Sequence, residues 1–134
     1  MEPGGICMGD GLKRLIQAAQ QLEEADLIIQ NGTIVDVFSL ETFEADVAIR
    51  DGRIVGIGTY PNGKQVVDAT GKFILPGFID GHIHIESTMV TPSQFSRALI
   101  KHGITTVVTD PHEIANVAGT IGIDFMLEDA ANAD

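Results

Sequence analysis

The sequence predicts a fold of the α/β plus β class, in which an antiparallel β-sandwich segment precedes two β/α units. Two glycine-containing turn signals lie between β-rich runs in the first half, and the spacing of apolar residues changes after Pro76-Gly77. From there the order strand, helix, strand, helix is expected. A complete (β/α)8 barrel needs about 250 residues, so any barrel in this chain of 134 residues is incomplete.

Residues 1–25 are expected to form a leader and one packing helix. Asp10 is a candidate N-cap for a helix that runs to about Ala25, because its short side chain can accept hydrogen bonds from the first turn. The apolar positions recur at helical spacing and form one stripe: Leu12, Leu15, Ile16, Ala19 and Leu22.

Residues 26–77 are expected to form the antiparallel β-sandwich segment. Asn31-Gly32 and Asp51-Gly52 each lie between two runs of β-forming residues, which is the strongest short-range signal for a hairpin turn. Pro61-Asn62-Gly63 indicates a third turn. Two further short strands are expected at residues 65–68 and 72–75.

Residues 78–134 are expected to supply the two β/α units, with parallel strands joined by right-handed crossovers. Buried strands are expected at 78–85 and 104–109, and helices at about 92–102 and 120–130. Thr91-Pro92-Ser93-Gln94 fits a capping box with proline at the first helical position. The apolar set expected to face inward from the last helix is Ile121, Ile123, Phe125 and Met126.

The composition argues against several classes of protein. The formal net charge is −11, from 8 Lys+Arg against 19 Asp+Glu, and an acidic chain repels nucleic-acid backbones and anionic membranes. Cys7 is the one cysteine, so no internal disulfide and no cysteine-rich zinc site can form. Without a signal-peptide pattern or a long apolar run, a cytoplasmic location is expected.

The sharpest chemical feature is His82-Ile83-His84-Ile85-Glu86. On a strand, alternate side chains share a face, so His82, His84 and Glu86 are expected to point the same way. Two imidazoles beside acidic groups suit a divalent metal, and Asp80 on the same face is a candidate to orient one of them. The competing interpretation is two ordinary histidines on a strand. The C-terminal end of a parallel strand, where α/β enzymes place their sites, favours the metal.

Asp110-Pro111-His112-Glu113 lies at the matching end of the second strand. This position predicts that His112 and Glu113 face the same pocket as the histidine pair. A helix N-terminus also favours acidic residues, which would account for Glu113 but not for His112. The zinc nucleobase-deaminase signature needs a Pro-Cys-x-x-Cys partner, which the sequence lacks, and neither a Gly-x-Ser-x-Gly elbow nor a phosphate loop is present.

Two long motifs resemble the amidohydrolase superfamily and, within it, the bacterial adenine deaminases. They are Pro76-Gly77-Phe78-Ile79-Asp80-Gly81-His82-Ile83-His84-Ile85-Glu86-Ser87-Thr88-Met89-Val90-Thr91-Pro92 and Thr106-Val107-Val108-Thr109-Asp110-Pro111-His112-Glu113-Ile114-Ala115-Asn116-Val117. The resemblance implies a β sandwich joined to a TIM-type barrel of a metal-dependent hydrolase. It also implies hydrolysis of adenine to hypoxanthine and ammonia at a binuclear centre of manganese or iron, with zinc as a further option. His82 and His84 match the metal ligands, and Glu86, His112 and Glu113 match catalytic motif positions.

The chain is shorter than members of that family. In the family, further metal ligands and a catalytic aspartate come from later barrel strands, which this sequence does not contain. The chain is therefore expected to be an N-terminal fragment, inactive alone and prone to self-association, with a small-molecule purine (adenine) as the substrate of the parent. Two alternatives stay open: another cyclic amidohydrolase, such as a dihydroorotase or imidazolonepropionase relative, and a non-catalytic truncated module.

Overall fold

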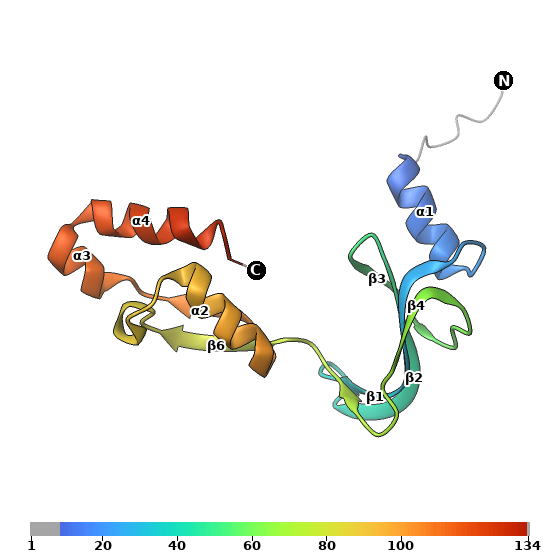
Figure 1. The fold of residues 1–134 in the computed structure, drawn as a ribbon. Coiled ribbons are helices and arrows are strands. Elements are labelled where there is room, and N and C mark those ends of the chain that lie inside the picture. Colours follow the sequence, from blue (N-terminus) through green and yellow to red (C-terminus); the bar gives the residue numbers. More distant parts are fainter. Residues whose placement is uncertain (1–8, 134) are drawn as a thin grey trace. The chain divides into compact units, whose positions relative to one another are not determined.

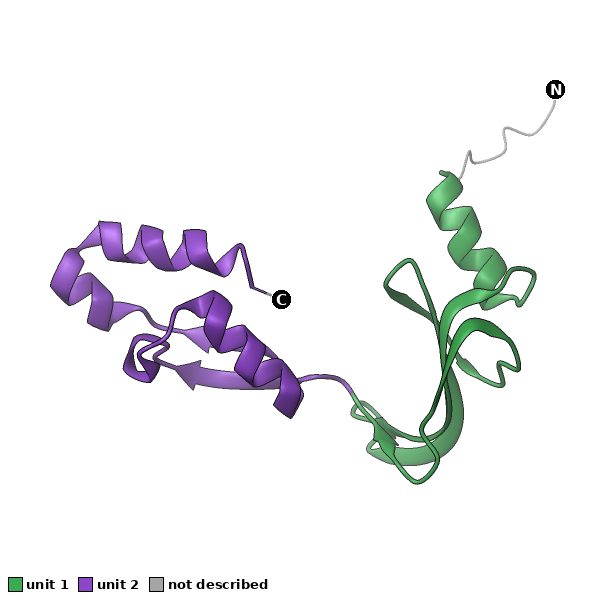
Figure 2. Cartoon of the chain, in the orientation of Figure 1, with its two compact units in different colours: residues 1–75 green, residues 76–134 purple. Residues whose placement is uncertain are grey.

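The computed structural model describes residues 9–133, and the chain divides into two compact units, Met1–Leu75 and Pro76–Asp134 (Figure 2). Each unit has its own sheet. None of the helices within residues 9–133 is long and apolar enough to cross a membrane.

The first unit contains a five-stranded mixed sheet in the order β3-β2-β1-β4, with β5 also paired to β1 (Figure 1). Its strands are β1 (Ala25–Asp36), β2 (Glu41–Arg50), β3 (Arg53–Gly58), β4 (Gly63–Asp68) and β5 (Phe73–Ile74). The predicted purely antiparallel sheet is wrong, because β4 and β5 run parallel to β1. Within the described part of this unit all strands lie in one sheet, so the predicted sandwich is not evident.

The parallel pairing of β4 depends on contacts that local turn signals cannot show. Ala25 of β1 pairs with Gly63 of β4, and a Cβ on Gly63 would lie 2.5 Å from Cγ1 of Ile28. Ile28 is fully buried and packs with Ala25, Ala48 and Tyr60 in the core of the unit. Glycine at position 63 therefore lets β4 approach β1 over the core.

Asn31-Gly32 forms a bulge inside β1, and the predicted hairpin turn there is wrong. The register against β2 shifts between Ile29 and Gly32, and Asn31 has a φ of 60°. Its backbone N–H donates to Asp46 Oδ1, and its side-chain amide donates to Asp68 Oδ1. The unpaired residue of the bulge thus bonds to two carboxylates from neighbouring strands, and β1 continues to Asp36.

The second predicted hairpin is confirmed. Asp51 and Gly52 join β2 to β3, with Arg50 opposite Arg53. Both turn residues have positive φ, 49° and 70°, as a type I′ turn requires.

Helix α1 (Asp10–Ala19) is shorter than predicted. Gly9 is the N-cap residue and no side chain caps the helix, so Asp10 lies in the first turn instead. At the other end, Gln21 takes a φ of 61° and Leu22 N–H donates to the Gln17 carbonyl. This Schellman arrangement ends the helix before the expected limit at Ala25.

The second unit has a two-stranded parallel sheet, covered by helices that follow each strand (Figure 1). Its elements are β6 (Phe78–Ile83), η1 (Glu86–Thr88), α2 (Pro92–Leu99), η2 (Ile100–His102), β7 (Ile104–Thr109), α3 (His112–Ala118) and α4 (Thr120–Ala130). The predicted order and the parallel pairing are confirmed, whereas a barrel is not evident from these two strands.

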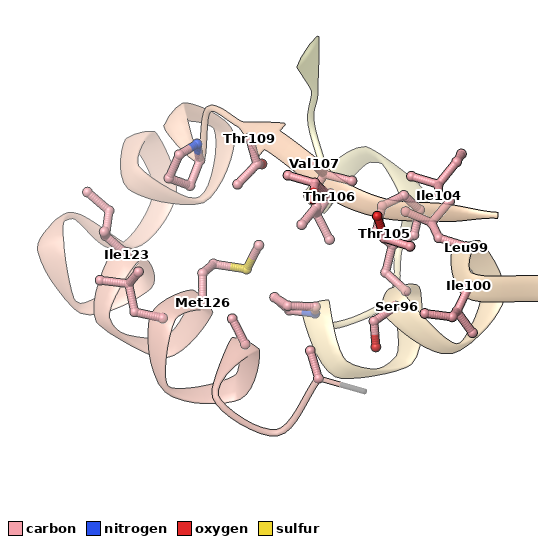
Figure 3. A pocket seen from close by; sticks show the side chains of 17 residues that line it. Ser96, Leu99, Ile100, Ile104, Thr105, Thr106, Val107, Thr109, Ile123 and Met126 are labelled. Carbon is pink, nitrogen blue, oxygen red and sulfur yellow. The ribbon is translucent and has the colours of Figure 1, made fainter. Parts of the chain in front are cut away.

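A cavity of about 320 Å³ lies in the second unit between β7, α2 and α4 (Figure 3). Phe95, Leu99 and Met126 line it together with residues of β7. Met126 is buried as predicted, but Ile121, which was expected to face inward, is 76% exposed. The lining of the cavity is largely apolar and lacks histidine and carboxylate side chains, so the cavity is separate from the candidate site.

The N-terminus of α2 is capped from α4. Thr91 makes no capping bond to the backbone, so the predicted capping box is wrong, although Pro92 holds the first helical position as expected. The carboxylate of Asp129 instead accepts a hydrogen bond from Ser93 N–H at 2.7 Å. This bond lowers the pKa of Asp129 below its ordinary value of 3.8.

Replacing Asp129 with Ala is therefore expected to destabilise the chain in a pH-dependent way. A lowered folded-state pKa means that the stabilisation is complete above the ordinary pKa and is lost as the pH falls through the folded value. Thermal melts of Asp129→Ala should fall below wild type near neutral pH and approach it in acid. The control Asp124→Ala removes a carboxylate from the exposed surface of the same helix. If the melting temperatures of Asp129→Ala and wild type differed as much in acid as at neutral pH, the capping role of Asp129 would be contradicted.

Candidate metal centre

The histidine pair lies at the C-terminal end of β6. His82 belongs to the strand, and His84 follows its last residue, Ile83. Nε2 of His82 lies 3.1 Å from Nε2 of His84, and the two rings meet edge to face with centroids 4.8 Å apart. The alternation predicted from the sequence thus brings two imidazole nitrogens to one point.

This separation fits two ligands of one cation. Zinc–imidazole bonds are about 2.0–2.1 Å long, so two nitrogens at angles of about 90–110° on one ion lie about 2.9–3.4 Å apart. The 3.1 Å between the Nε2 atoms falls within this interval. The donor type also fits, because neutral imidazole suits zinc, iron and other transition metals.

The other nitrogen of His84 has a partner that fixes the ring. Nδ1 lies 2.9 Å from the backbone carbonyl oxygen of Asp110, which is the residue after β7. A carbonyl oxygen only accepts hydrogen bonds, so Nδ1 carries the proton and Nε2 keeps its lone pair. This is the arrangement in which metal-binding histidines are usually held.

His112 lies on the other side of His84. Its ring centroid is 4.6 Å from that of His84, and its Nδ1 is 3.0 Å from Oδ2 of Asp110. Candidate ligand atoms of His84, Asp110 and His112 all lie within 4.8 Å of one another. His112 is the first residue of α3.

The two glutamates lie apart from the strand face that carries the histidines. Glu86 was expected beside His82 and His84, but β6 ends at Ile83 and Glu86 begins η1. Its Oε1 accepts a hydrogen bond from Ile114 N–H at 3.3 Å, while its Oε2 is buried with no partner among residues 9–133.

Glu113 is held by a residue that the sequence analysis did not single out. Both its carboxylate oxygens accept from the hydroxyl of Ser87, at 2.8 and 2.9 Å. Asp80 Oδ1 accepts a hydrogen bond from the backbone N–H of His82, a main-chain contact in place of the expected bond to an imidazole. The structure therefore brings three histidines together with Asp110, and gives the acidic side chains around them specific backbone or hydroxyl partners.

Two family descriptions match the chain. "Urease alpha-subunit, N-terminal domain" matches residues 2–78, and "Amidohydrolase family" matches residues 73–133. By the match over more than half of its length, the chain belongs to the family "Urease alpha-subunit, N-terminal domain". Its residues 73–133 are similar to the amidohydrolase family. The family resemblance predicted from the two motifs is thereby confirmed.

Curated relatives of the chain include adenine deaminases. It is 57% identical to adenine deaminase of Listeria innocua over 122 residues, which are 91% of the chain and 21% of that protein. It is 58% identical to adenine deaminase of Bacillus licheniformis over 117 residues, which are 87% of the chain and 20% of that protein. The chain is thus a partial homologue of adenine deaminase and spans about a fifth of the length of these relatives.

Solved amidohydrolases share the fold of this chain. D-hydantoinase matches with a TM-score of 0.58 and 30% identity over 79% of the chain and 25% of that protein. N-acyl-D-glutamate deacylase from Bordetella bronchiseptica, solved with zinc, matches with a TM-score of 0.52 and 34% identity over 65% of the chain and 19% of that protein. A structure of D-aminoacylase is described by its binuclear metal centre and matches with a TM-score of 0.53 and 32% identity over 63% of the chain and 18% of that protein.

Proposed function

We propose that this chain supplies part of the metal site of an enzyme that hydrolyses adenine to hypoxanthine and ammonia. The observation that carries the proposal is the 3.1 Å approach of the His82 and His84 Nε2 atoms at the end of β6. The substrate is inferred from the adenine deaminase relatives at 57–58% identity. D-hydantoinase, at 30% identity, is a more distant guide to the substrate.

The residues take distinct roles in this proposal. His82 and His84 hold a divalent cation, manganese or iron or else zinc, in a centre that becomes binuclear with ligands from outside this chain. When bound, such a cation lowers the pKa of water and supplies a nucleophile at neutral pH. Glu86, Glu113 and His112 bind the purine or move a proton between the nucleophile and the leaving nitrogen.

We also propose a domain organisation, a cellular location and an association state for the protein. We assign residues 1–25 to an N-terminal segment that contains α1, and residues 26–77, whose strands form one mixed sheet here, to part of a β-sandwich of the whole enzyme. Residues 78–134 are the first two β/α units of its barrel. The protein acts in the cytoplasm. The isolated chain self-associates, because the two-stranded sheet has unpaired outer edges within the described residues, and its strands carry exposed apolar side chains such as Ile79 and Val108.

A chimera tests the function directly. The aligned segment of Listeria innocua adenine deaminase is replaced by this chain, and ammonia release from adenine is measured with added Mn²⁺. We expect metal-dependent turnover, and a loss of about 10²–10⁴-fold when Glu113→Gln removes a proton-transfer group. Hydantoin is the control substrate. A folded chimera that hydrolyses hydantoin but leaves adenine unchanged would reject adenine as the substrate.

The same assay on the 134-residue chain alone is expected to show no turnover. Its candidate donors all lie at or just after the C-terminal ends of two strands. General acid–base groups are each worth about 10²–10⁴-fold in rate. Metal-dependent ammonia release by a preparation that contains only this chain would contradict the proposal that further ligands are needed.

A further inference from the structure

Asp110 contacts two of the histidines in the cluster, His84 and His112. Its backbone carbonyl oxygen is 2.9 Å from Nδ1 of His84. Its carboxylate oxygen Oδ2 is 3.0 Å from Nδ1 of His112. One residue therefore uses its main chain for one imidazole and its side chain for the next.

Both contacts have the same chemical consequence. A carbonyl oxygen and an ionised carboxylate are acceptors only, so each imidazole must donate from Nδ1. In the neutral ring the lone pair is then on Nε2. The Nε2 of His84 is the atom that approaches Nε2 of His82.

We infer that Asp110 is a positioning residue that sets the tautomer of both His84 and His112, and is not itself a metal ligand. The inference rests on the proposed metal site in one respect, namely that Nε2 of His84 binds the cation. His112 stacks edge to face against His84 with an interplanar angle of 80°. By holding His112, the carboxylate also limits the rotation of the His84 ring.

The position of Asp110 explains why one residue can serve both rings. It follows Thr109, the last residue of β7, and Thr109 is paired with Ile83 of the parallel strand β6. The N–H of Asp110 donates to the Ile83 carbonyl at 3.4 Å, which holds its main chain beside the end of β6. His112 comes two residues later, at the start of α3.

Two substitutions separate positioning from direct metal binding. Asp110→Asn keeps an oxygen that accepts from Nδ1 of His112 but removes the negative charge that a metal ligand would supply. Asp110→Ala removes the acceptor altogether. The control Asp124→Ala removes a carboxylate from the exposed surface of α4 in the same unit, and circular dichroism verifies the fold of each variant.

Nitrogen-15 NMR of the labelled 134-residue chain, recorded in mildly alkaline buffer, reads the tautomers of its imidazoles. We expect Nδ1–H on both His84 and His112 in the wild type and in Asp110→Asn. In Asp110→Ala, His112 should change to the Nε2–H form that free histidine prefers, while His84 keeps Nδ1–H. An Nε2–H His112 in the wild type, or an unchanged His112 in Asp110→Ala, would overturn the inference.

The second measurement is the zinc affinity of the same chains, determined by titration in a calorimeter. Loss of a residue that orients a metal-binding histidine costs about 10–100-fold in affinity. In Asp110→Ala the backbone partner of His84 remains, so the loss comes only through the released His112 ring and should lie at the lower end of this range. Asp110→Asn should keep near wild-type affinity. An equal loss in both variants would show that the carboxylate binds the ion. A wild type with the expected tautomers that binds no zinc would reject the proposed metal site and leave the positioning role of Asp110 intact.

Discussion

Replacing His84 with Ala is expected to reduce the affinity of the chain for Zn²⁺ or Mn²⁺ by more than about 100-fold. Residues that only orient a ligand are worth about 10–100-fold, and loss of the ligand itself should exceed that range. His84 is the middle ring of the cluster, because it contacts His82 through Nε2, Asp110 through Nδ1 and His112 through the ring. Removing it takes away one ligand and releases its neighbours.

Equilibrium metal titration of the purified chain measures this effect. His102→Ala is the matched control. Of the four histidines in the sequence, His102 is the one outside the cluster, and it lies exposed in η2, before β7. It should keep the wild-type affinity. Equal losses in the two variants, or none in His84→Ala, would mean that the metal binds through other groups.

Replacing Ile28 with Ala is expected to lower the free energy of unfolding of the first unit by about 2–5 kcal/mol. Ile28 is the one large side chain that is fully buried within the described residues, and it packs with Ala25, Ala48 and Tyr60. These few neighbouring side chains cannot shift enough to fill the space that the Ile28→Ala substitution would leave. The cost therefore includes both the lost burial and the residual cavity.

Urea unfolding followed by circular dichroism measures this loss. Ile54→Ala in β3 is the control, since the Ile54 side chain is 66% exposed and its truncation should change stability by less than about 0.5 kcal/mol. If the two variants lost equal stability, Ile28 would not be the centre of the core.

The sequence predicted the fold best where local signals decide it. The β-branched run of β7 between Gly103 and Asp110 matches the observed strand, and α4 begins and ends where expected. Asn31-Gly32 and Asp51-Gly52 carry the same hairpin signal, yet one is a bulge and the other a turn. The difference comes from distant carboxylates that bind Asn31, and a local pattern does not contain them.

In the candidate site, too, the sequence predicted what residue spacing and strand pairing decide, and it did not predict what depends on where a strand ends. The approach of His82 to His84 follows from their two-residue spacing, and the proximity of His112 follows from the parallel pairing of β6 and β7. The place of Glu86 could not be predicted, because the alternation stops where the strand ends at Ile83. The contact of Asp110 with His84 runs through a backbone carbonyl, which any residue type would offer.

The central claim is that one cation binds between His82 and His84. Its most direct test is a crystal of the 134-residue chain grown with zinc and measured at the zinc absorption edge, so that anomalous scattering locates the ion. We predict one strong peak about 2.0–2.1 Å from the Nε2 atoms of both histidines. Zinc bound elsewhere on the chain, with no imidazole nitrogen of this pair within bonding distance, would contradict the account.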